Sequence, residues 1–211
     1  MQNLIADERR DLAAVLAGLT PDQWEAPSLC GGWRVREVAA HLSLPFRYST
    51  AQVLLGILQA RGSFDRMADQ RARADAAALT TEQLTAAILD NADVEWKPPG
   101  GGLAGALSHD VIHGLDITVA LGLPRRVPHD RLQIVLDGLA TPKRLKTTGV
   151  DLSGVQLCAD DLDWTFGTGT PVTGSAQDLL LVLAGRTLPP GHLHGELTTR
   201  FVRSSRRVGL R

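Results

Sequence analysis

The spacing of apolar residues predicts a helical chain over roughly its first two thirds. Residues 2–18 repeat leucine, isoleucine and valine at helical spacing, with the acidic and basic residues on the opposite face. Residues 34–44 repeat the pattern, and a third apolar run extends from residue 46 to about residue 60. Proline lacks the amide donor of a helix, so Pro45 is expected to break or kink the chain between these two runs.

The next segments alternate between polar and strongly apolar character. Residues 61–80 are charged and weakly apolar, which predicts a surface helix or lid. A second helix is expected over residues 81–96, where Thr80 or Thr81 supplies a capping signal. The Pro- and Gly-rich residues 97–102 predict a loop, and residues 103–121 then form the most apolar helix of the chain, followed by Gly122 as its cap.

The pattern changes after about residue 145, where a helix expected over residues 129–145 ends. Residues 154–174 alternate and contain several glycines, which predicts two or three short strands with tight turns. A helix capped by Ser175 follows, and residues 193–202 are expected to form a last strand. The predicted fold class is therefore α+β, mainly α, with a helical domain at residues 1–145 and a small α+β domain at residues 146–211.

Composition narrows the function classes. The chain has 44% hydrophobic and 21% charged residues and a formal net charge of −1, so no nucleic acid partner and no anionic membrane surface are expected. No apolar run approaches the ~20 residues that cross a bilayer. Cys30 and Cys158 stand far apart and predict no disulfide framework. The N-terminal residues do not resemble a signal peptide, so a cytoplasmic protein is expected.

The candidate chemistry lies in the most apolar helix, in the stretch "SHDVIHGLDI". His109 and His113 are four residues apart, and this spacing lets two imidazoles reach one metal ion from the same helix face. Two histidines at this spacing also arise by chance. Buried imidazoles need partners, however, and Asp116 or Asp110 could accept the proton of the second ring nitrogen. His41, on the helix at residues 34–44, could supply a third ligand and leave one coordination position open.

Three stretches resemble a known family. The chain "LTPDQWEAPSLCGGWRVREVAAHL" followed by "HDVIHGLDITVALG" resembles the mycothiol-dependent maleylpyruvate isomerases, which belong to the DinB-like metal-binding superfamily. The stretch "DWTFGTGTPVTGSAQDLLLVLAGR" resembles the small sterol-carrier-protein-like C-terminal domain of these proteins. The resemblance extends over nearly the whole chain and implies an up-down-down-up four-helix bundle followed by the small α+β domain.

The resemblance also implies a site. It places a divalent metal, zinc first and nickel as the alternative, on His41, His109 and His113, with mycothiol as the thiol cosubstrate. His109 stands where the isomerase itself has glutamate. A neutral ligand at that position raises the charge of the site by one and favours a bound thiolate or hydroxide. Because of this departure, the resemblance does not define the substrate.

The leading hypothesis is a metal-dependent thiol enzyme of the isomerase or S-transferase type, which adds the thiol to a small electrophile. Asp116 and Glu37 are candidate carboxylates behind the histidines, and Arg186 and Arg200 are candidates for binding an anionic cofactor or substrate. The alternatives are a non-catalytic metal- or ligand-binding protein and a His-Asp metal phosphohydrolase. Monomer and homodimer are both compatible with the sequence.

Overall fold

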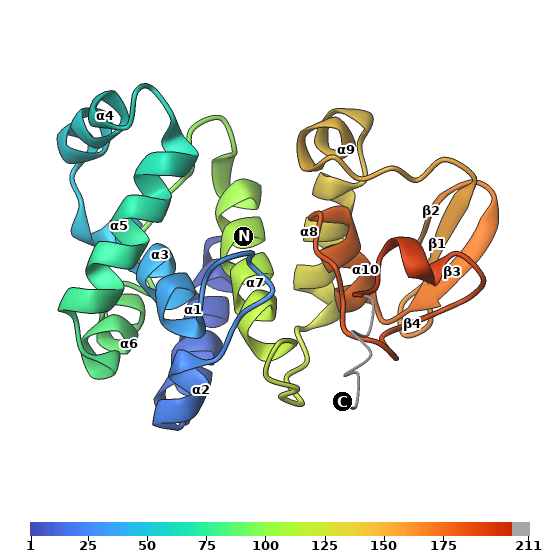
Figure 1. Ribbon diagram of the computed structural model, residues 1–211, viewed down its shortest axis with the longest axis horizontal. Coiled ribbons are helices and arrows are strands. Elements are labelled where there is room, and N and C mark those ends of the chain that lie inside the picture. Colours follow the sequence, from blue (N-terminus) through green and yellow to red (C-terminus); the bar gives the residue numbers. More distant parts are fainter. Residues whose placement is uncertain (204–211) are drawn as a thin grey trace, which may run out of the picture. The chain divides into compact units, whose positions relative to one another are not determined.

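The computed structural model describes residues 1–203, which form helices and one small sheet (Figure 1). The chain separates into two compact units, Met1–Leu123 and Pro124–Arg211. The first unit is helical and the second contains the strands. The predicted class, α+β and mainly α, is confirmed. The domain boundary at residues 145–146 remains a prediction; the second unit begins earlier and includes one helix that precedes this boundary and one that spans it.

The first unit is built from seven helices. They are α1 (Gln2–Ala17), α2 (Pro21–Glu25), α3 (Val35–Arg47), α4 (Thr50–Gln59), α5 (Phe64–Ala78), α6 (Thr81–Leu89) and α7 (Gly102–Thr118). Helix α3 is central, because it packs against α5, α6 and α7, while α1 packs against α6 and α7. A core of buried leucine, valine, alanine and isoleucine side chains, with Trp24, fills the space between α1, α2, α3, α5, α6 and α7.

Side-chain caps define where several of these helices begin. Thr20, Ser49, Ser63 and Thr80 each accept a hydrogen bond from a backbone amide three residues later. Such caps satisfy amides that have no partner within the helix. Of the two threonines that the sequence offered as a cap for α6, Thr80 is the one used.

In the second unit two helices precede a mixed sheet, and a third helix lies between the third and the fourth strand. Its elements are α8 (His129–Leu139), α9 (Pro142–Thr148), β1 (Val155–Ala159), β2 (Thr165–Gly167), β3 (Thr170–Gly174), α10 (Ala176–Leu183) and β4 (Leu193–His194). The strand order is β2-β1-β3-β4, with β1 parallel to β3 and the other pairs antiparallel. Helix α10 packs against β1, β3 and α8, and its N-cap is Ser175, as expected from the sequence.

Several predicted elements were wrong in detail: the helix expected over residues 81–96 ends at Leu89, and the helix expected over residues 129–145 is divided into α8 and α9. Helix α3 continues past Pro45 to Arg47. The proline removes the one hydrogen bond that its own amide would donate to the carbonyl of His41, whereas the amide of Tyr48 still donates to the carbonyl of Leu44 at 3.2 Å. Of the two alternatives for residues 61–80, a helix and a lid, the structure has the helix: α5 buries Met67 and Ala72 and packs on α3. The predicted strand at residues 193–202 is only two residues long. It turns away at Gly195, which has φ +124°, and ends in a 3₁₀ turn at Thr198–Arg200.

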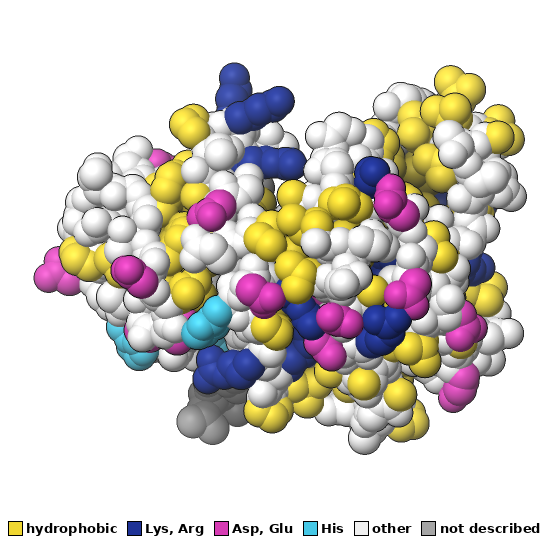
Figure 2. All heavy atoms as spheres, turned by 180° about the vertical axis from the view of Figure 1, so that it is seen from behind, with side chains coloured by type: hydrophobic (Ala, Val, Ile, Leu, Met, Phe, Trp, Pro, Cys, Tyr) yellow, Lys and Arg dark blue, Asp and Glu magenta, His cyan; other side chains and the backbone are white. Residues whose placement is uncertain are grey.

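The surface of the described chain carries both signs of charge. On the face shown in Figure 2, acidic and basic side chains are interspersed among hydrophobic ones. None of the helices described is both long and apolar enough to cross a membrane. The expectation that the protein does not bind nucleic acid remains a prediction.

Candidate metal centre

Two neighbouring helices of the first unit carry the three histidines. His41 lies in α3, whose buried face includes Val38 and Leu42, and its ring is partly buried beside that face. His109 and His113 lie one turn apart in α7. Because α3 packs against α7, the apolar packing of the two helices brings His41 to the pair.

The three imidazoles converge on one point. The Nε2 atoms of His41 and His109 are 3.2 Å apart, and one ring nitrogen from each of the three residues lies within 4.8 Å of the others. The ring centroids are 5.0 Å apart for His41 and His109, 4.8 Å for His41 and His113, and 5.0 Å for His109 and His113. The structure therefore brings His41, His109 and His113 together, as expected from the sequence.

Carboxylates hold the second nitrogen of both α7 histidines. Nδ1 of His109 is 2.9 Å from Oδ1 of Asp110, and Nδ1 of His113 is 3.0 Å from Oδ2 of Asp116. Both aspartates are buried, and a carboxylate at this position makes Nδ1 the protonated nitrogen. The lone pairs on Nε2 are then available for a metal. Asp116 was the carboxylate favoured from the sequence for contacting a ring nitrogen. In the structure Asp116 contacts His113 and Asp110 contacts His109.

Burial controls the charge of His41. Burial lowers the pKa of His41 well below its usual value of 6.5, and the nearby His113 and His109 lower the pKa further. Its Nδ1 atom is buried and has no hydrogen-bond partner among the described residues, so no carboxylate stabilises a second proton. His41 is therefore neutral at pH 7, which is the form that binds metals.

This shift predicts how the stability of the metal-free protein depends on pH. Below about pH 6.5 the unfolded chain protonates His41 whereas the folded chain does not, so the free energy of unfolding should fall as the pH decreases. One such proton contributes a slope of at most about 1.4 kcal/mol per pH unit. Urea unfolding between pH 5 and pH 7.5 measures it.

The control for this prediction replaces histidines at two positions. His41→Gln should flatten the slope, whereas His129→Gln, at an exposed position, should leave the slope unchanged. An identical pH dependence in His41→Gln and the unchanged protein would contradict the assignment.

The donor set fits a divalent metal with a preference for imidazole. Two nitrogen ligands about 2.05 Å from a tetrahedral ion lie about 3.3 Å apart, close to the 3.2 Å between the Nε2 atoms of His41 and His109. Three imidazoles suit zinc, and they also suit nickel and copper. Three protein ligands would leave a position for water or a substrate.

Two tryptophan rings flank the histidines. The ring centroid of Trp33 is 5.1 Å from that of His41, and the ring centroid of Trp96 is 5.2 Å from that of His109. The Nε1 atom of Trp33 donates to Asp69 at 2.7 Å, which fixes that ring. No local pattern identifies Trp96, because its loop meets α7 only in the folded unit.

The loop before α3 connects the two histidine helices. The amide of Leu29 donates to the carbonyl of Asp116 at 3.0 Å. This contact places Cys30 close to α7, where one ligand atom each of Cys30, His113 and Asp116 lies within 4.8 Å of the others. The "PSLCGGW" stretch therefore has a structural role: it joins the start of α3 to the helix that carries His109 and His113.

The remaining candidates lie elsewhere. Glu37 accepts from the backbone amide of Arg34 at 2.8 Å and from its guanidinium, so its observed contacts are those of a helix cap. These hydrogen bonds outweigh the effect of burial and lower the pKa of Glu37. Its proposed role behind His41 remains a prediction.

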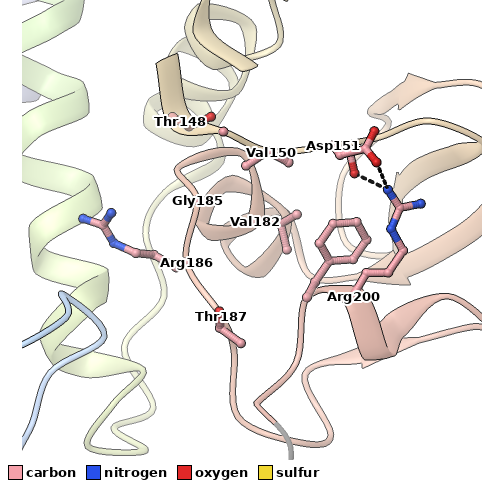
Figure 3. A pocket seen from close by; sticks show the side chains of 10 residues that line it. Thr148, Val150, Asp151, Val182, Gly185, Arg186, Thr187 and Arg200 are labelled. Atoms are coloured by element: carbon pink, nitrogen blue, oxygen red, sulfur yellow. Dashed lines mark hydrogen bonds and ion pairs between the residues drawn. The ribbon is translucent and has the colours of Figure 1, made fainter. Parts of the chain in front are cut away.

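The two arginines lie within the second unit, at a pocket of about 390 Å³ whose lining includes Val182 and Phe201 (Figure 3). Arg200 is paired with Asp151 at 2.9 Å, and Figure 3 shows Arg186 pointing away from Arg200. The two guanidinium groups thus do not converge in this pocket. Binding of an anionic cofactor or substrate by Arg186 and Arg200 stays a prediction.

Comparisons with known proteins agree with the motifs. Residues 5–97 match the family model described as the mycothiol maleylpyruvate isomerase N-terminal domain. A crystal structure of the mycothiol-dependent maleylpyruvate isomerase matches with a TM-score of 0.55 and 15% identity, covering 92% of this chain and 90% of that one. A histidine-to-alanine mutant of that isomerase matches with a TM-score of 0.53 and 14% identity, over 90% of this chain and 92% of its own. No curated protein matches significantly. At this identity the structural matches show a shared fold.

Proposed function

We propose that this protein is a metal-dependent enzyme that uses a low-molecular-weight thiol, namely mycothiol, because residues 5–97 match the family model of mycothiol maleylpyruvate isomerase N-terminal domains. The observation that carries the proposal is the convergence of His41, His109 and His113, whose ligand atoms lie within 4.8 Å of one another. The solved structures with the same fold are described as mycothiol-dependent isomerases, which supports mycothiol as the thiol.

The three histidines would hold zinc, with nickel as the alternative. When bound, such an ion lowers the pKa of a coordinated thiol and supplies a thiolate at neutral pH. Asp110 and Asp116 keep the Nδ1 protons of His109 and His113, so that both rings present Nε2. His41 is held neutral by burial and presents its own Nε2 toward His109.

The proposed reaction is addition of the thiolate to an electrophilic small molecule. For an isomerase, the sulfur adds to a conjugated double bond, the resulting single bond rotates, and loss of the thiolate restores the double bond in the other geometry. For an S-transferase, the sulfur displaces a leaving group from an activated carbon and stays on the product. The neutral His109 adds one unit of positive charge relative to a glutamate, and this favours an anionic sulfur at the site.

Of the two alternative functions, only the phosphohydrolase predicts different contacts at the site. A His-Asp phosphohydrolase needs the aspartate beside His109 to bind metal. Asp110 instead uses Oδ1 for Nδ1 of His109 and Oδ2 for Arg9, which argues against that alternative. A non-catalytic binding protein keeps the same three histidines, and only a reaction distinguishes it from the enzyme.

Metal content and turnover test the proposal together. The purified protein, reloaded with zinc or nickel, is expected to hold about one ion per chain. It should either isomerise maleylpyruvate in the presence of mycothiol, which is regenerated, or accelerate the consumption of mycothiol with chlorodinitrobenzene. Glutathione serves as the comparison thiol. Metal binding without any thiol binding or turnover would overturn the enzymatic proposal and favour a binding protein. Absence of metal after reloading would overturn the site itself.

A further inference from the structure

Arg9 is a buried arginine in the first helix, far from the histidine motifs in sequence. The residue is 1% exposed, and its guanidinium carbon lies 4.8 Å from the centroid of the Phe46 ring. A buried guanidinium is costly unless several acceptors surround it. Helices α1 and α7 pack side by side (Figure 1), and the acceptors of Arg9 come from α7 and from the loop after α6.

The first contact of Arg9 leads to a predicted metal ligand. Its Nε atom donates to Oδ2 of Asp110 at 2.8 Å, while Oδ1 of the same carboxylate is 2.9 Å from Nδ1 of His109. Both oxygens of Asp110 are therefore engaged, one by each neighbour. A carboxylate held at both oxygens cannot rotate without losing a hydrogen bond, so Arg9 fixes the acceptor that sets the tautomer of His109.

The second set of contacts leads to the tryptophan beside the same histidine. Nη1 of Arg9 donates to the carbonyls of Asn91 at 3.3 Å, Ala92 at 3.2 Å and Val94 at 2.7 Å. These carbonyls precede Trp96, whose ring centroid is 5.2 Å from that of His109. One guanidinium thus holds both the carboxylate behind His109 and the loop that places an aromatic ring against it.

We propose that Arg9 is a positioning residue of the metal centre. It orients His109 through Asp110, and it holds Trp96 against His109 through the loop at residues 91–94. The inference rests on the proposed function in one respect, that His109 binds the metal. Lysine cannot replace the guanidinium, because the Nε contact and the Nη1 contacts diverge from one planar group.

Zinc affinity tests the proposal with a matched pair of variants. Arg9→Lys should weaken zinc binding about tenfold, the lower end of what changes behind a metal ligand cost. Arg10→Lys is the control, because Arg10 is the next residue of α1 and reaches Asp93 of the same loop, but is exposed. Competition with a chelator measures both affinities in protein whose circular dichroism shows a native helix content. Equal affinities in the two variants would overturn the proposal.

A nuclear magnetic resonance measurement on the unchanged protein covers the case in which Arg9→Lys does not fold. Zinc addition should shift the Nε–H resonance of Arg9 and leave that of Arg10 in place. Equal shifts, or no shift at Arg9 while zinc binds, would contradict the connection.

The metal-free protein separates this inference from the proposed function. If no metal binds, the proposed function fails. Arg9 can then still be judged from the ring nitrogens of His109. The Nδ1–H tautomer should dominate in the unchanged protein and in Arg10→Lys, and should mix with the Nε2–H tautomer in Arg9→Lys. A single tautomer in all three proteins would show that Arg9 does not position His109.

Discussion

His113→Asn is expected to weaken zinc binding by about 100-fold. Four protein ligands of a structural zinc share an apparent binding free energy of about 10–16 kcal/mol, or about 3 kcal/mol for each, and every 1.4 kcal/mol is a factor of about ten. Asparagine is the sharpest replacement, because its amide nitrogen can still donate to Asp116 as Nδ1 of His113 does, at 3.0 Å. The variant therefore removes Nε2 and spares the buried carboxylate.

Isothermal titration of the metal-free proteins with zinc measures this loss. His129→Asn is the control, since His129 is exposed at the start of α8, outside the first unit. Mycothiol-dependent turnover, measured as isomerisation or as S-transfer, should fall together with zinc occupancy. Retention of the original affinity in His113→Asn would show that His113 is no ligand, and loss of affinity in His129→Asn would point to a general effect of removing a histidine.

Leu115→Ala is expected to lower the free energy of unfolding by about 2–5 kcal/mol without changing the site. Leu115 lies in α7 two residues after His113 and is 0% exposed, so its truncation removes buried contacts and leaves a cavity. Urea unfolding of the metal-free protein measures the loss. Leu58→Ala is the matched control, because Leu58 in α4 is 73% exposed and should change stability by no more than about 0.5 kcal/mol.

His113→Asn and Leu115→Ala both change α7, and together they separate the effect on the metal site from the effect on the stability of the fold. Protein carrying Leu115→Ala should bind zinc within a few-fold of the original affinity while it stays folded, because the leucine contributes no ligand atom. A large loss of zinc affinity at a temperature where the variant is folded would mean that packing under α7 sets the histidine geometry. A stability change as small as that of Leu58→Ala would contradict the burial of Leu115.

Much of the helical unit was predictable from local signals. Caps such as Thr20 and Thr80 define helix starts because they satisfy amides within three residues of themselves. The four-residue spacing of His109 and His113 likewise guarantees a shared helix face before any packing is known. The errors were at places where packing outweighs local preference. At residues 61–80 the local pattern left a helix and a lid open, and the structure has helix α5, which buries Ala68 and Ala72 and packs against α3.

The sequence by itself determined where most of the helices begin, the pairing of His109 with His113 and, by resemblance, the addition of His41. Only the tertiary structure decided which carboxylates hold the rings, that Trp96 meets His109, and that Arg9 joins Asp110 to the loop at residues 91–94. The physical reason is the sequence separation of the residues that interact. Helix geometry is set by neighbours within four residues, whereas Arg9 and Asp110 are 101 residues apart and meet because α1 and α7 bury their apolar faces against each other.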